Sequence, residues 1–165
     1  MKDFLRLDID KVVAGWTSLE PTPAELDAIL ELAYLAIASD GVVTRTEMEA
    51  FAVVMERLFG PEMTAKHIEQ VLEQYEDSLD RSGFRKRLRT VAGQLQRAPV
   101  RDRAYQLAYA MVMCDLDTNL HEFEFDKALR EHLGLDEDAA EALVDSVIDL
   151  VIARAPAAGD QAGPR

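Results

Sequence analysis

Apolar residues recur along this chain at intervals of three and four positions, the spacing of one face of an α-helix. One such stripe follows Thr22 and consists of Leu26, Ile29, Leu30, Ala33 and Ile37. Similar stripes continue as far as Val151, and no stretch shows the alternation of apolar and polar positions that marks a strand. The pattern predicts an all-α protein, a bundle of about seven to eight helices.

Capping residues mark where helices begin and end. Thr22 and Glu25 lie three positions apart, and so do Thr44 and Glu47. A Thr and a Glu at this spacing form a capping box, in which each side chain accepts a hydrogen bond from the backbone of the other residue. Gly41 lies between the two boxes, and glycine tolerates the left-handed conformation that ends a helix. We therefore expect one helix after Thr22, a turn at Gly41, and a second helix after Thr44.

Composition divides the chain into three parts. Residues 1–20 predict an N-terminal helical segment that leads into a proline-containing break. Residues 21–153 predict one helical domain, which suits a chain of 165 residues. Residues 154–165 are rich in Ala, Gly and Pro and carry no apolar stripe, so they predict a disordered tail. We expect Phe4 and Trp16 to dock the first segment on the bundle; the alternative is that they bind another chain.

The net charge limits the classes of partner. The chain holds 31 acidic residues against 18 Lys and Arg, a formal net charge of −13. Such a chain repels phosphate backbones, so we expect no nucleic acid partner. No apolar run approaches the roughly 20 residues that cross a bilayer, so we expect no membrane insertion. The charged N-terminus lacks the apolar core of a signal peptide and the single Cys excludes a disulfide framework, so we expect a cytoplasmic protein.

One segment opposes the overall charge. Residues 81–103 contain one acid, Asp102, among the cations Arg81, Arg85, Lys86, Arg87, Arg89, Arg97, Arg101 and Arg103. Two interpretations stay open: these cations neutralise acidic neighbours within the fold, or an acidic protein partner docks on them. Under the second interpretation, we expect Arg85, Lys86 and Arg89 to bind the partner.

Two segments of the chain are similar to each other. Residues 32–40 read LAYLAIASD, and residues 107–115 read LAYAMVMCD. Each segment ends a helix in aspartate, and each continues through a short turn into an amphipathic helix. The similarity predicts two pseudo-repeated three-helix units, joined by the basic helix, that bury faces neither unit could bury alone.

The two turns also carry a family resemblance. Residues 38–47, ASDGVVTRTE, resemble the turn of the tellurite-resistance TerB-like family, and residues 115–124, DLDTNLHEFE, are similar. The resemblance covers roughly residues 24–152 and departs from the family at Thr118, where glycine is usual. It implies an all-helical bundle of about seven helices, a bacterial stress response, and an acidic surface that binds divalent metal.

Carboxylates gather at both turns: Asp40, Glu47, Asp115, Asp117, Glu122 and Glu124. Ca²⁺ and Mg²⁺ prefer oxygen ligands of this kind, so these residues are the candidate ligands. Asp115, Asp117 and Asn119 repeat the start of an EF-hand loop, but Leu120 replaces the glycine of its sharp turn, which excludes a regular EF-hand. The alternative is that the acids only cap their helices and favour the helix dipoles.

No motif of nucleophilic, phosphate-binding or zinc-hydrolase chemistry occurs, so we expect a protein that is not an enzyme. The predicted function is that of a cytoplasmic bacterial stress-response protein that binds a divalent cation through its acidic turns and contacts protein partners. We expect a monomer or a weak dimer. The alternative is a metal-free scaffold that holds its partner through the basic helix at residues 81–97 or through the N-terminal helix.

Overall fold

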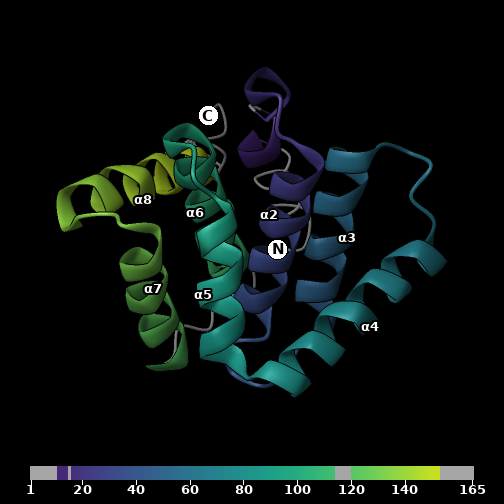
Figure 1. Ribbon diagram of the computed structural model, residues 1–165. Helices are drawn as coiled ribbons and strands as arrows, with labels where there is room; N and C mark the ends of the chain where they lie inside the picture. Colours follow the sequence, from purple (N-terminus) through teal and green to yellow (C-terminus); the bar gives the residue numbers. More distant parts are fainter. Residues whose placement is uncertain (1–10, 15, 114–119, 153–165) are drawn as a thin grey trace, which may run out of the picture.

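The computed structural model in Figure 1 describes residues 11–14, 16–113 and 120–152, and every regular element in these ranges is helical. A short 3₁₀ helix, η1, precedes seven α-helices. The bounds are η1 Thr17–Leu19, α2 Pro23–Ile37, α3 Arg45–Phe59, α4 Ala65–Ser82, α5 Phe84–Gln94, α6 Ala98–Val112, α7 Leu120–Leu133 and α8 Glu137–Ile152. The prediction of an all-α bundle is confirmed.

Helices α2 and α6 form the centre of the bundle, and each packs against several other helices. Leu32 and Ala33 of α2 have no exposed surface, and neither have Leu107 and Ala108 of α6. The small alanine side chains allow two helices to approach closely, while the leucines fill the space beside them. The two similar sequence segments therefore supply much of the core.

The predicted capping boxes are both present. Thr22 Oγ1 accepts a hydrogen bond from the Glu25 backbone N–H at 3.2 Å, and Glu25 Oε2 accepts one from the Thr22 N–H at 3.0 Å. Thr44 and Glu47 form the same reciprocal pair at the start of α3. Gly41 has a φ of +82°, as expected for the residue that turns the chain between α2 and α3. The two Thr–Glu pairs in the sequence therefore predict both helix starts correctly.

The N-terminal segment docks on the bundle as far as the structure describes it. Val12, Val13 and Trp16 belong to the hydrophobic core, and Trp16 is only 1% exposed. Among the described residues, the Trp16 indole nitrogen finds no hydrogen-bond acceptor. The prediction for Trp16 is therefore confirmed, whereas Phe4 and the expected tail at 154–165 lie outside the described residues.

The remaining helices flank this centre. Figure 1 shows α4 running along one side of the molecule, with α7 and α8 on the other side and α5 between them. Helices α5 and α7 lie next to each other and run in the same direction. This parallel pair carries the surface that concerns function.

Candidate binding groove between α5 and α7

Two cations of the basic segment form ion pairs with acids of α2. The Arg87 guanidinium donates two hydrogen bonds to the Glu31 carboxylate, at 2.7 and 2.6 Å, and so ties α5 to the central helix α2. Arg97, just before α6, donates to Glu25 at 2.8 Å. For these two cations the structure supports the first interpretation, neutralisation within the fold.

The pKa values of the two acids, Glu31 and Glu25, shift in opposite directions. Burial raises the pKa of Glu31, and the hydrogen bond from Arg87 lowers it by a smaller amount. The pKa of Glu25 is lowered, chiefly by its hydrogen bond with Arg97. The side chain of Glu31 is 6% exposed and that of Glu25 is 11% exposed, while their arginines are 21% and 47% exposed. The Arg87–Glu31 pair is therefore the more deeply buried of the two.

Three other cations of α5 point outward. Arg85, Lys86 and Arg89 are all exposed. Within the part of the chain that the structure describes, no carboxylate forms an ion pair with any of them. Arg85 and Arg89 lie four residues apart, so they share one face of α5. These are the three residues that the sequence predicts to bind a partner, and the structure leaves them accessible.

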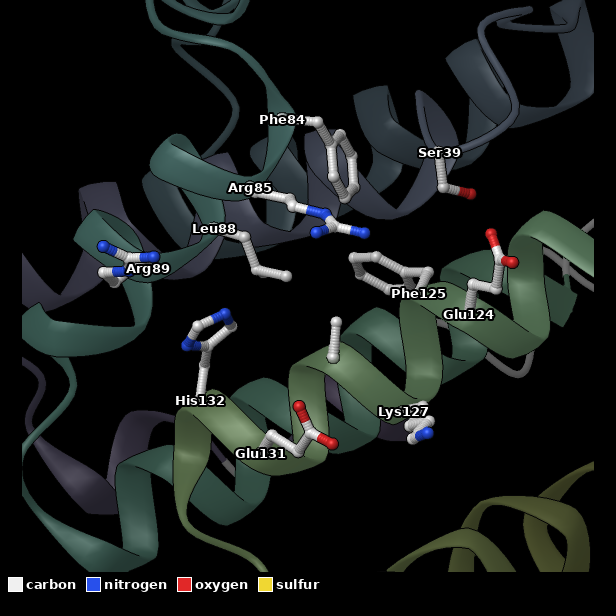
Figure 2. A pocket seen from close by; sticks show the side chains of 11 residues that line it. Ser39, Phe84, Arg85, Leu88, Arg89, Glu124, Phe125, Lys127, Glu131 and His132 are labelled. Atoms are coloured by element: carbon white, nitrogen blue, oxygen red, sulfur yellow. The ribbon is translucent and has the colours of Figure 1, made fainter.

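An open groove with a volume of about 480 Å³ runs between α5 and α7. Its apolar floor includes Phe84 and Leu88 from α5, and Phe125 and Ala128 from α7. The rings of Phe84 and Phe125 meet edge to face, with centroids 5.9 Å apart, and hold the two helices together. We call this feature, with its floor and charged edges, the α5–α7 groove (Figure 2).

Charge is unequal along the two edges of the α5–α7 groove. The α5 edge is basic and carries Arg85 and Arg89, whereas the α7 edge alternates as Glu124, Lys127 and Glu131. Figure 2 shows Arg89 close to His132 at one end of the groove, and Ser39 close to Glu124 at the other. An occupant would therefore meet one uniformly positive edge and one mixed edge.

The six predicted metal ligands are only partly described. The Asp40 carboxylate accepts a hydrogen bond from the Val42 backbone N–H at 2.9 Å, and Glu47 is buried as a capping residue. Glu124 is exposed and lines the α5–α7 groove. Asp115, Asp117 and the side chain of Glu122 lie outside the described residues.

Two observations bear on whether these acids meet. No three His, Cys, Asp or Glu side chains among the described residues stand close enough together to hold a metal ion. However, Ser39 at the end of α2 lines the same groove as Glu124 of α7. The α2–α3 turn and the first turns of α7 therefore lie near each other, as convergence of the two acidic turns would require.

Sequence reasoning missed the α7 side of the groove. About forty residues of chain separate the start of the basic helix from Phe125, Lys127 and His132. At such a separation, the spacing of residues in the sequence does not indicate which side chains come into contact. Helical periodicity predicts that Phe125 is buried but does not identify the ring it meets. No sequence feature pairs α7 with α5, so the groove emerges only from the tertiary arrangement.

No family model, no curated protein and no solved structure matches this chain. None of the helices in the described ranges is both long and apolar enough to cross a membrane. Function is therefore inferred from the geometry of the residues themselves.

Proposed function

We propose that this protein is a non-enzymatic interaction module, and that it binds an acidic protein partner on the α5–α7 groove. The supporting observation is that Arg85 and Arg89, free of ion pairs with any described carboxylate, line an open groove with an apolar floor. Lys86, which is also exposed, lies beside them on α5. In a chain with a net charge of −13, this is a local surface of opposite sign.

The floor and the edge would contribute differently to binding. Leu88 and Phe125 of the floor are already buried in the fold. Phe84 and Ala128 are only partly buried, so they would supply affinity by burying apolar area against a partner. Exposed cations would contribute mainly to the rate of encounter and to the choice of partner. An acidic segment that also carries apolar side chains fits both requirements.

Selection from a random peptide library tests this proposal without assuming a conformation for the ligand. We expect the wild-type protein to enrich peptides that combine Asp or Glu with large apolar residues. The variant Arg85→Glu/Arg89→Glu should lose this enrichment. A matched control is Arg45→Glu/Lys66→Glu, which reverses two exposed cations on α3 and α4 and should keep it. Equal enrichment by all three proteins would contradict the proposal.

A divalent-cation function is a second candidate, favoured by the proximity of Ser39 and Glu124 in one groove. Asp40, Glu47, Asp115, Asp117, Glu122 and Glu124 would supply oxygen ligands to Ca²⁺ or Mg²⁺. A bound cation stabilises the native state by RT ln(1 + [L]/Kd), about 2.7 kcal/mol at a hundredfold excess over Kd.

Thermal melting separates this candidate from general screening by salt. Millimolar Ca²⁺ or Mg²⁺ should raise the melting temperature more than Na⁺ at matched ionic strength. The variant Asp117→Asn/Glu124→Gln should remove the difference. Equal responses to divalent and monovalent salt would rule the candidate out and leave the interaction module.

The family resemblance and the internal repeat are further parts of the proposal. We also propose a TerB-like stress-response role in the bacterial cytoplasm, supported by the resemblance of the two turn motifs to that family. The repeat predicts that residues 24–76 superimpose on residues 99–152, with α2, α3 and α4 matching α6, α7 and α8. A different crossing direction of the helices in the two halves would contradict it.

A further inference from the structure

We infer that the occupant of the α5–α7 groove is an amphipathic α-helix of the partner, with one acidic edge that faces α5. This inference rests on the proposed function and specifies the conformation and polarity of the ligand. Its basis is the shape of the groove, the helical walls on both of its sides and the unequal charge of its two edges.

The shape of the groove matches a helix. Its two walls are parallel helices, and the lining residues extend from Glu124 to His132 on α7, which corresponds to about 12 Å along the helix axis. That length is about two turns of a third helix. A helix that lies along two others at an interaxial distance of about 8–10 Å fits its side chains between theirs. The α5–α7 groove therefore suits a helix as its ligand.

The walls of the groove also favour a helix over an extended peptide. Both walls are helices, so they offer a ligand side chains and not free backbone hydrogen-bonding groups. An extended peptide gains its affinity from backbone hydrogen bonds to a sheet edge, and the described residues contain no strand. A helix satisfies its own backbone groups and needs only side-chain contacts from the groove.

The charges of the two edges set the orientation of that helix about its axis. Arg85 and Arg89 require two carboxylates about one turn apart on the facing edge of the ligand. On the α7 edge the two carboxylates of Glu124 and Glu131 outnumber the cation Lys127, so a second acidic edge would meet net repulsion there. The helix that fits is thus acidic on one side of its apolar stripe, and neutral or basic on the other.

Synthetic peptides test the inference directly. The probe is an alanine-rich peptide of about 18 residues, long enough to form helix in isolation, with a leucine stripe and glutamates at i and i+4 along one edge. A second peptide has the same composition but the glutamates on the face opposite the leucines. A third contains a central proline, which breaks the helix. Fluorescence anisotropy gives each Kd, and circular dichroism reports the helicity of the bound probe.

We expect the probe to bind at least about tenfold more tightly than either companion peptide, and to gain helicity on binding. Arg85→Glu/Arg89→Glu should weaken the probe by a similar factor, and Arg45→Glu/Lys66→Glu should leave its Kd unchanged. A probe with lysines in place of the glutamates should bind the Arg85→Glu/Arg89→Glu variant better than the wild type. Melting curves check that each variant is folded, and this reciprocal rescue separates lost recognition from lost structure.

Contrary outcomes fall into distinct classes. Equal affinity for the proline peptide would show an extended ligand, which overturns this inference but leaves the proposed function intact. Sedimentation of the protein alone tests a second copy as occupant: a dimer that Arg85→Glu/Arg89→Glu dissolves would overturn the inference. Failure of every peptide, together with no enrichment from the library, would overturn the proposed function as well.

Discussion

The cations of α5 fall into two groups that neighbour each other in sequence but differ in environment. Arg87 is largely covered and forms two hydrogen bonds to a buried carboxylate of α2. Arg85, Lys86 and Arg89, one or two residues away, face solvent beside the α5–α7 groove. A rotation of about 100° per residue along the helix separates the two groups. A run of like charge can therefore hold a fold together on one face and leave accessible cations at a candidate binding groove on another.

The largest expected effect comes from breaking the inward group. Arg87→Ala should lower the free energy of unfolding at pH 7 by about 3 kcal/mol, because it leaves the Glu31 carboxylate buried without its partner. Urea denaturation measures this loss. Lys86→Ala, one residue away on the exposed face, is the matched control and should change stability by less than about 0.5 kcal/mol. Similar losses for the two variants would remove the distinction between the groups.

A smaller effect is expected at Arg97, the second cation that pairs with an acid of α2. Arg97→Ala should lower the free energy of unfolding clearly less than Arg87→Ala does, because the Arg97 side chain is 47% exposed and solvent screens the pair. Thermal melting in low and high salt checks this expectation, and the wild-type advantage should shrink as salt rises. A loss of stability as large as that of Arg87→Ala would show that solvent exposure does not determine how much each ion pair contributes to the free energy of unfolding.

The pH dependence should distinguish Glu31 from Glu25. The raised pKa of Glu31 means that the native state holds this proton more tightly than the unfolded chain does, so Glu31 opposes stability as pH rises from about 4.5 through its native pKa. Glu25, with a lowered pKa, contributes stability above about pH 4.5 that is lost as pH falls through its native pKa. Glu31→Gln should therefore steepen the rise of stability with pH above about 4.5, and Glu25→Gln should flatten it below that value. Urea midpoints at several pH values measure both slopes, and slopes that change in the same direction would contradict the assignment.

The smallest effect on stability is expected for the outward group. Arg85→Ala/Lys86→Ala/Arg89→Ala should alter the free energy of unfolding by no more than about 0.5 kcal/mol, since the described residues include no carboxylate paired with these side chains. The same variant should lose the enrichment of acidic peptides. Calorimetry measures the first quantity and library selection the second. A marked loss of stability would place these cations with the inward group.

The features predicted correctly from sequence depend on near neighbours. Thr22 with Glu25, and Thr44 with Glu47, form their caps over a single helical turn, so residue spacing alone defines them. The apolar period likewise gives the helical class, because each helix needs one buried face. Gly41 adopts the positive φ expected of the residue that turns the chain.

The α5–α7 groove depends on contacts between distant parts of the chain. Residue spacing cannot show that Arg87 faces Glu31, since that contact joins α5 to α2 across the core. It also cannot show that Phe125 meets Phe84, because helix packing alone decides which helix lies beside α5. The sequence thus predicted the exposed cations of the candidate site and missed its opposite wall.

Trp16 gives the molecule a built-in optical label. It is the only tryptophan in the chain, and its ring is almost fully enclosed where the N-terminal segment meets the bundle. An indole in so apolar a setting emits fluorescence at shorter wavelengths than one in water. The emission wavelength of Trp16 therefore reports whether the N-terminal segment is docked on the bundle. Detachment of this segment would redden the emission while the circular dichroism of the main helices stayed unchanged. Fluorescence and circular dichroism together therefore distinguish local detachment of the N-terminal segment from global unfolding.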